Sequence, residues 1–269
     1  MSIWQEETLA RQFWREGKAP CPIYDMHGHV GNNASMYHAR CQAPDMVKHM
    51  RRIGVTRLVF SHMDALAGVM RNAEVVEICK RFPDILRMYV AVNPRHPEYI
   101  KEDLARFGEF RPYAVGLKLL PYYHKVPVNA KPYEYALKFA DEHALPVLIH
   151  TWGTVPENNG EAVLDVVRKY SRPRFFLAHC IYGEWDYAER CVKESHGNVW
   201  LELTAVPGMR GLVEMLTRRV GSERLLFGTD MPWFDEYQAA GGILAARISE
   251  DDRRNILYRN AEMILGKNF

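Results

Sequence analysis

Short, continuous apolar runs recur at eight places along the chain, with polar segments between them. Their apolar residues follow one another rather than alternating with polar ones, which is typical of parallel strands covered on both faces. We therefore predict eight buried strands, over Ile23 to His27, Arg57 to Ser61, Arg87 to Val92, Val115 to Leu119, Pro146 to His150, Arg174 to His179, Asn198 to Leu203 and Arg224 to Phe227.

The segments between these runs have the spacing of amphipathic helices. In Pro132 to His143 and in Gly160 to Tyr170, apolar residues recur every three or four positions among charged ones. Pro44-Asp45 and Ser249 to Asp252 are typical helix starts, because acidic residues favour the positive end of the helix dipole. Strands that alternate with helices predict an α/β fold, either a closed barrel or a doubly wound sheet.

Residues able to bind a divalent cation end four of the eight runs. His27 and His29 end the first run, and because residues i and i+2 of a strand point to the same face, both imidazoles project together. His150, His179 and Asp230 end or follow the fifth, sixth and eighth runs. Only a barrel brings these strand ends to one mouth, so we predict a single (β/α)8 TIM barrel with its active site at the C-terminal ends of the strands.

Length and composition agree with this fold. The chain has 269 residues, and a barrel of this kind typically needs about 250. We expect one domain over residues 1–269, in which residues 1–20 form an N-terminal extension. Apolar residues make up 48% of the chain and charged residues 25%, as in ordinary globular domains and unlike disordered or membrane proteins.

Charge and cysteine content narrow the class further. The net charge is +2, from 35 basic and 33 acidic residues in no obvious block, so we expect no nucleic-acid partner. No segment has the ~18 apolar residues that a membrane span needs, and the charged N-terminus does not resemble a secretory signal. Five cysteines without a C-x-x-C pair argue against disulfides and thiolate metal sites. We expect a cytoplasmic protein with a small-molecule substrate, and a homo-oligomer is compatible with the sequence.

The motifs around the candidate ligands resemble those of the amidohydrolase superfamily, in particular its amidohydrolase-related branch of metal-dependent TIM-barrel hydrolases and decarboxylases. They are Asp25-Met26-His27-Gly28-His29, His150, His179 and Gly228-Thr229-Asp230, and the resemblance covers roughly Ile23 to Leu265. It implies a bound zinc or another divalent ion, one per chain. Imidazole nitrogen and carboxylate oxygen suit such an ion.

The resemblance also implies roles for single residues. His27, His29, His150 and Asp230 match the metal ligands of the single-metal members. His179 matches the residue that polarises the metal-activated water or the substrate, and Asp230 would also accept the proton of that water. His179 and Asp230 are therefore the two candidate catalytic residues.

Lys118 and His124 are candidate substrate-binding residues. Lys118 ends the fourth run, and we expect it to hold a substrate carboxylate, so that the substrate is anionic. In other branches the matching lysine is carbamylated and bridges two metal ions, and an interior ion pair is a third alternative. Family members often carry a histidine where this chain has Leu120, and His124 is a candidate to replace it.

Three further residues complete the candidate substrate pocket. Trp152 and Trp233 follow strand ends, where they either line the pocket or close the top of the barrel. Glu202 ends the seventh run, and it is a barrel-mouth acid, an acceptor for a ligating histidine or a structural ion-pair partner.

Together these residues favour a metal-dependent hydrolase that acts on an ester, lactone or amide of a small carboxylated substrate through a metal-activated water. A metal-dependent non-oxidative decarboxylase on the same scaffold is the main alternative, because fold and ligands do not separate the two. A barrel that binds a metal or metabolite without chemistry is a third. The sequence leaves open the substrate, the number of metal ions and the carbamylation of Lys118.

Overall fold

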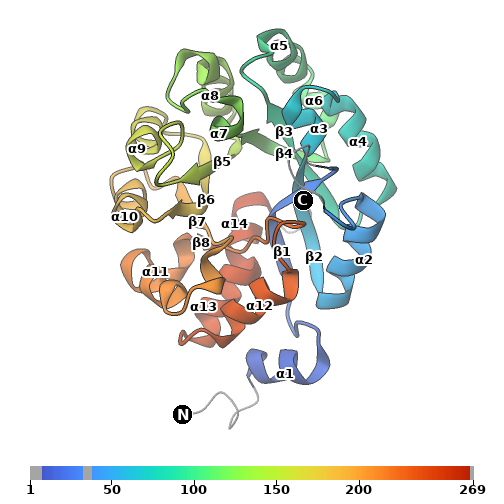
Figure 1. Cartoon of the computed structure of the whole chain (residues 1–269), viewed down its shortest axis with the longest axis vertical. Helices are drawn as coiled ribbons and strands as arrows, with labels where there is room; N and C mark the ends of the chain where they lie inside the picture. The colour runs from blue at the N-terminus through green and yellow to red at the C-terminus, as the bar shows by residue number, and fades with distance from the viewer. Residues whose placement is uncertain (1–7, 33–37, 267–269) are drawn as a thin grey trace.

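Eight parallel strands surrounded by helices form the centre of the computed structural model, which describes residues 8–32 and 38–266 (Figure 1). The strands are neighbours in chain order, and they are β1 (Ile23–Val30), β2 (Val55–His62), β3 (Leu86–Val92), β4 (Ala114–Leu119), β5 (Pro146–Trp152), β6 (Arg174–Tyr182), β7 (Val199–Glu202) and β8 (Leu225–Leu226). Each overlaps one of the eight predicted runs. The predicted (β/α)8 TIM-barrel fold is confirmed.

Helices connect the strands and cover the outside of the barrel (Figure 1). They are α1 (Leu9–Glu16), α2 (Ala43–Ile53), α3 (Met63–Ala67), α4 (Asn72–Arg81), α5 (Pro97–Ala105), α6 (Phe107–Phe110), α7 (Pro121–His124), α8 (Lys131–His143), α9 (Gly160–Lys169), α10 (Trp185–Lys193), α11 (Leu212–Val220), α12 (Glu236–Ala245), α13 (Glu250–Arg254) and α14 (Asn260–Leu265). Short helical turns occupy Val206–Gly208, Ser222–Arg224 and Asn255–Arg259. None of the helices in the described ranges is both long enough and apolar enough to cross a bilayer.

The interior of the barrel is packed with alternate strand residues, while the residues between them face the helices. The interior cluster consists of Tyr24, Met26, Val59, Tyr89, Leu148, Phe176, Ala178, Trp200 and Leu226. Ala261 and Ile264 of α14 join this cluster. The hydroxyl of Tyr24 donates to the carboxylate of Glu262 at 2.9 Å. Helix α14 therefore covers the N-terminal end of the barrel, and the chemistry of such folds belongs to the other end.

The barrel closes between β8 and β1, although β8 is only two residues long. Main-chain hydrogen bonds beyond the end of β8 complete the closure: the amide of Asp230 donates to the carbonyl of His27 at 2.6 Å, and the amide of His29 donates to the carbonyl of Met231 at 2.7 Å. The seam of the barrel therefore runs directly between the predicted ligands of the first and eighth strands.

Strands β5 and β6 extend past the histidines at which the predicted runs end. In β6 the backbone turns left-handed over three consecutive residues, with φ of 60° at His179, 54° at Cys180 and 53° at Ile181. A β-branched residue such as Ile181 rarely adopts positive φ, so surrounding contacts must hold this turn. The amide of Ile181 donates to Oγ1 of Thr151 in β5 at 2.9 Å, which is one such contact.

The predicted N-terminal extension contains α1, which packs on the barrel. Phe13 is buried, and its ring lies 6.2 Å from that of Tyr237 in α12. The amide of Leu9 donates to the Glu250 carboxylate in α13 at 3.1 Å. These contacts support the proposal that the chain forms one domain.

Gly116 in β4 offers a test of the barrel packing. A Cβ atom there would lie 2.2 Å from the carbonyl oxygen of Pro146 in β5, so the two strands would have to move apart. We expect Gly116→Ala to lower the free energy of unfolding by about 1–3 kcal/mol, as in other overpacked interiors. Gly108→Ala is the control, because an added methyl group there meets no atom within 4 Å. Denaturant unfolding measures both variants, and equal stabilities would contradict the packing described for β4.

Candidate active site

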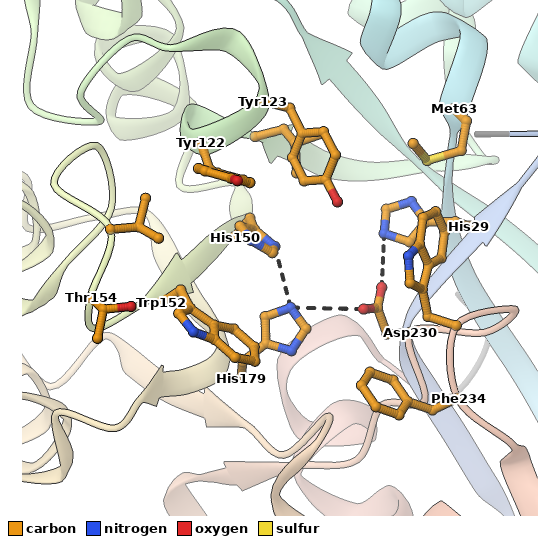
Figure 2. Close-up of a pocket in the computed structure, with 13 residues that line it drawn as sticks. His29, Met63, Tyr122, Tyr123, His150, Trp152, Thr154, His179, Asp230 and Phe234 are labelled. Carbon is orange, nitrogen blue, oxygen red and sulfur yellow. Dashed lines mark hydrogen bonds and ion pairs between the residues drawn. The ribbon is translucent and has the colours of Figure 1, made fainter. Parts of the chain in front are cut away.

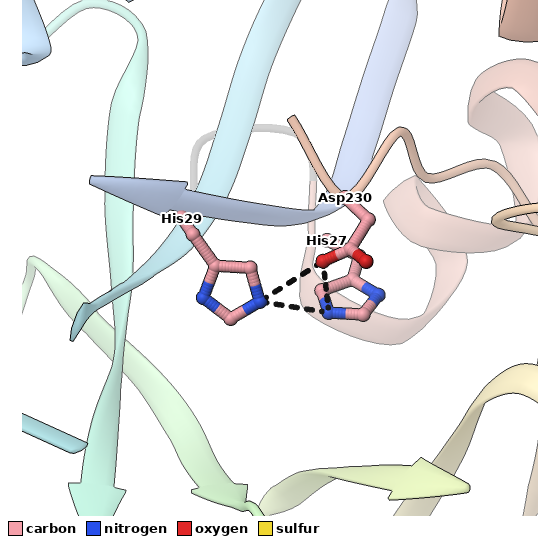
Figure 3. Close-up of side chains that lie close together, drawn as sticks. All are labelled: His27, His29 and Asp230. Atoms are coloured by element: carbon pink, nitrogen blue, oxygen red, sulfur yellow. Dashed lines mark hydrogen bonds and ion pairs between the residues drawn. The ribbon is translucent and has the colours of Figure 1, made fainter. Parts of the chain in front are cut away.

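His27 and His29 of β1 and Asp230 beyond β8 form a compact, buried cluster (Figure 3). Oδ1 of Asp230 lies 3.2 Å from Nε2 of His27 and 3.0 Å from Nε2 of His29, and the two nitrogens are 3.3 Å apart. Ligand atoms that are about 2.1 Å from one ion lie about 3.0–3.4 Å from each other in tetrahedral or octahedral geometry. The spacing and chemistry of these three atoms therefore fit a divalent cation.

The second ring nitrogen of each histidine is held by a neighbouring side chain. Nδ1 of His27 donates to Oε2 of Glu202 at 2.7 Å, and Nδ1 of His29 lies 3.0 Å from the hydroxyl of Ser61. Histidines that bind metals commonly have such a partner, which fixes the ring orientation and leaves the other nitrogen free for the ion. Both Nε2 atoms accordingly face the cluster.

Glu202 lies beneath the cluster and is fully buried. Its Oε1 accepts hydrogen bonds from the amide and hydroxyl of Thr204, at 2.7 Å and 2.5 Å. Burial raises the pKa of the Glu202 carboxyl, although His179 and the Thr204 hydrogen bonds oppose this. Of the alternatives for Glu202, the structure favours the acceptor for a ligating histidine. Glu202 is not among the residues that line the pocket described below.

Asp25 is a site residue that the sequence-based prediction missed. Its buried carboxylate accepts hydrogen bonds from the amide of His27 at 3.0 Å and from the amide and hydroxyl of Thr229, at 3.1 Å and 2.6 Å. Burial raises the pKa of Asp25 to about 8, against the lowering effect of Thr229. Because Thr229 precedes Asp230, Asp25 ties the two ligand segments together. An acid within an apolar run is the signal that indicates such a role, since a buried acid needs partners.

Lys118 is fully buried inside the barrel, and it is not among the residues that line the pocket described below. Its Nζ lies 2.8 Å from Nε2 of His27, on the side that faces the candidate ion. Burial lowers the pKa of Lys118 to about 8, although Asp230 and Glu202 oppose this. The predicted contact of Lys118 with a substrate carboxylate stays a prediction.

His150 and His179 lie side by side, next to the cluster formed by His27, His29 and Asp230. Nε2 of His179 is 3.2 Å from Nδ1 of His150 and 3.8 Å from Oδ2 of Asp230 (Figure 2). Burial lowers the pKa of both histidines, which keeps them neutral near pH 7. The structure thus brings three of the four predicted ligands into one cluster and places His150 beside His179.

Asp230 joins the two groups of histidines. Its Oδ1 belongs to the cluster with His27 and His29, and its Oδ2 faces His179. Burial would raise the pKa of Asp230, but the nearby His27, His29 and His179 outweigh it and hold the pKa below its usual range. Asp230 also has a left-handed backbone, with φ of 55°, which an aspartate adopts only where its surroundings require it.

A pocket of about 330 Å³ opens above the cluster at the C-terminal end of the barrel (Figure 2). Polar and aromatic side chains line it, including His29, His150, His179, Asp230, Tyr122, Tyr123, Trp152, Trp233 and Phe234. The ring of Trp152 lies edge-on to His179 at 5.5 Å, and that of Trp233 lies edge-on to His29 at 5.2 Å. Both predicted tryptophans are therefore at the pocket. None of the described residues that line it is a lysine or an arginine.

His124 does not line this pocket, but it lines the cavity beside it. Its Nε2 donates to the carbonyl of Leu66 at 2.9 Å, so its Nδ1 accepts the hydroxyl proton of Tyr133, also at 2.9 Å. Both ring nitrogens are thereby used. Burial lowers the pKa of His124, and the neutral ring connects α3, α7 and α8.

The chain is similar to known proteins in sequence family and in fold. A family model described as Amidohydrolase matches residues 24–267. A dihydroxybenzoic acid decarboxylase from Polaromonas, with bound manganese and 2-nitroresorcinol, has a TM-score of 0.74 at 16% identity and covers 92% of this chain and 98% of its own. A 5-carboxyvanillate decarboxylase from Novosphingobium aromaticivorans, complexed with manganese, has a TM-score of 0.69 at 12% identity over 91% and 95%.

A probable 2-pyrone-4,6-dicarboxylic acid hydrolase from Acinetobacter baumannii, with citric acid bound, has a TM-score of 0.68 at 13% identity over 91% of this chain and 99% of its own. No curated protein sequence matches the chain. At these identities the structural likeness shows the fold, whereas the family match extends over nearly the whole sequence.

Glu202 predicts a measurable effect on metal affinity. Glu202→Gln removes the carboxylate charge beneath His27 and should weaken binding of a divalent ion about 10- to 100-fold, the range expected for losing such a supporting acceptor. Titration of zinc or manganese into the metal-free protein measures this. Glu214→Gln, an exchange in α11 far from the cluster, is the control. Unchanged metal affinity in Glu202→Gln would mean that Glu202 stabilises the barrel interior and does not support the ligand His27.

Proposed function

This chain belongs to the amidohydrolase family, and we propose that it is a metal-dependent hydrolase that cleaves an ester, lactone or amide of a small carboxylated substrate. One observation carries the proposal. A single carboxylate, Asp230, presents Oδ1 to His27 and His29 and Oδ2 to the pocket, 3.8 Å from Nε2 of His179. One residue can therefore hold an ion and also accept a proton.

We propose that His27, His29 and Asp230 hold one divalent ion, with His150 as the fourth candidate ligand because it lines the same pocket. Nitrogen and carboxylate ligands suit zinc, and two of the structurally similar proteins contain manganese. Such an ion would supply a Lewis acid that lowers the pKa of water toward about 7. Lys118 would then have to give up its contact with Nε2 of His27 or bind the ion as a carbamate, which is why the number of ions is part of the test.

The side chains would transfer the proton, stabilise the developing charge and position the ligands. Oδ2 of Asp230 would take the proton of the attacking water and return it to the leaving group. His179 would stabilise the negative charge that develops on the carbonyl oxygen, since a neutral imidazole can donate one hydrogen bond there. Asp25 and Glu202 would keep Asp230 and His27 in place through Thr229 and the Nδ1 hydrogen bond.

The pocket walls favour a planar substrate. Five aromatic side chains surround a space of about 330 Å³, a size that suits a small ligand. With no lysine or arginine among the described lining residues, a reacting carboxyl group would contact the ion and the histidines. The expected anionic substrate therefore no longer depends on Lys118.

The same walls favour decarboxylation as the second candidate function. Aromatic acids fit between aromatic side chains, and two of the similar structures are decarboxylases of aromatic acids. In that reaction Asp230 would carry a proton to the ring carbon that loses the carboxyl group, and no water would be consumed.

Turnover by the metal-loaded protein separates these functions. We expect release of acid from at least one aromatic ester, lactone or amide, with oxygen from isotopically labelled water in the product. Release of carbon dioxide from hydroxylated benzoates, without label in the product, would establish the decarboxylase instead. If the protein binds metal but turns over neither the esters, lactones and amides nor the hydroxylated benzoates, both proposed activities are contradicted. The chain would then be a binding protein.

Asp230 provides the residue-level test. Asp230→Asn keeps the size of the side chain but removes the base, so kcat should fall by a factor of about 100 or more. Elemental analysis of the same samples should find about one ion per chain in the wild type and some retained in the variant. Asp186→Asn, whose side chain is 89% exposed in α10, is the control. Full activity in Asp230→Asn would exclude the proposed base, and two ions per chain would support a carbamylated Lys118.

A further inference from the structure

A second cavity of about 370 Å³ lies beside the catalytic pocket. The two cavities adjoin, because Met63, Leu120 and Tyr123 line both of them. Figure 2 shows Tyr123 above the cluster, with its hydroxyl pointing into the catalytic pocket. The part of a longer ligand that leaves the catalytic pocket on the Tyr123 side would therefore point toward the second cavity.

Arg95 is the cationic side chain of this second cavity. It follows β3 and is exposed, and no lysine or other arginine stands among the described residues that line either cavity. In the part of the chain that the structure describes, no carboxylate forms an ion pair with Arg95. Its charge is thus available to a ligand.

The position of Arg95 is fixed by its neighbours. Its Nε donates to the carbonyl of His124 at 2.8 Å, and its amide donates to Oδ1 of Asn93 at 3.0 Å. The carbonyl of Leu66 in turn accepts from both His124 and Asn93, at 2.9 Å and 3.0 Å. The two terminal nitrogens of the guanidinium remain to bind a carboxylate, for which their planar geometry is suited.

Asp64 is the carboxylate that lines the same cavity. Its side chain is 47% exposed, and one of its oxygens lies 3.9 Å from Nδ1 of His62, a ring whose pKa burial lowers. Because Asp64 would repel an acidic ligand, the negative group must lie on the Arg95 side. The opposite charges of Arg95 and Asp64 predict opposite effects when each is removed.

We propose that Arg95 binds a second acidic group of the substrate, and that the substrate is an elongated derivative of a diacid: one end is the reacting ester, lactone or amide at His29 and Asp230, and the other is a free carboxylate at Arg95. This proposal rests on the proposed function for the identity of the reacting end. It gives His124 a positioning role, because the carbonyl of His124 orients Arg95. The charge recognition first expected of Lys118 thereby moves to the adjoining cavity.

The test measures binding rather than turnover, on the metal-loaded protein. Isothermal titration compares isophthalate with m-toluate, terephthalate with p-toluate, and biphenyl dicarboxylate with biphenyl monocarboxylate, so that each pair differs by one carboxylate. At least one diacid should bind about tenfold more tightly than its monoacid, as expected for one charge-assisted pair. Arg95→Met should reduce that ratio to about one while the monoacid binds as before. Arg95→Lys should keep part of it, and Asp64→Asn should raise it.

Arg210→Met is the matched control, since Arg210 is also exposed at the same end of the barrel but lines neither cavity. An unchanged ratio in Arg95→Met, an equal loss in Arg210→Met, or equal weakening of both members of a pair would overturn the proposal. If hydrolysis is found but every ratio is about one, the Arg95 site fails and the proposed function stands. If the ratio depends on Arg95 but no substrate turns over, the binding site stands and the hydrolase fails.

Discussion

Burial of several ionisable side chains around His27 is the constraint on which the rest of this structure depends. Nδ1 of His27 donates to Glu202 at 2.7 Å, while Nε2 lies 3.2 Å from Asp230 and 2.8 Å from Lys118. An isolated charge in a barrel interior is costly, so each of these groups requires the others as partners. The interior polar layer therefore holds its side chains in single orientations, which is what a metal centre with defined geometry needs.

The same layer explains why irregular backbone gathers at the mouth of an otherwise regular barrel. His179 within β6 and Asp230 beyond β8, the two proposed catalytic residues, have left-handed backbones. Such conformations persist only when surrounding bonds hold them. Two hydrogen bonds hold the backbone around Asp230: the Thr229 hydroxyl donates to the Asp25 carboxylate, and the amide of Asp230 donates to the carbonyl of His27. The hydrogen bonds that close the barrel between β8 and β1 therefore also orient the carboxylate of Asp230.

Above this layer, the mouth of the barrel contains two adjoining cavities that differ in the groups they offer to a ligand. The catalytic pocket is walled by aromatic rings and leaves charge recognition to the histidines and the ion they fit, whereas Arg95 stands in the neighbouring cavity. Hydrolysis and decarboxylation both remain compatible with the shared ligands, because the fold supplies the same strand ends to either reaction. What distinguishes substrates in this family member is therefore expected to lie in the loops after β3 and β4.

The sequence by itself determined the eight strands and the common direction of His27 and His29, because continuous apolar runs and the two-residue repeat of a strand are local properties. The meeting of Asp230 with these histidines was predicted from the barrel and from the family resemblance. The sequence did not determine where Lys118, His124 or Glu202 point. Lys118 was expected to hold a substrate carboxylate, but its burial and its contact with His27 depend on barrel packing. His124 was expected at the substrate, but Tyr133 and Leu66, distant along the chain, take both its nitrogens. The position of Arg95 likewise follows from a carbonyl contributed by another strand's loop, and only tertiary structure brings such partners together.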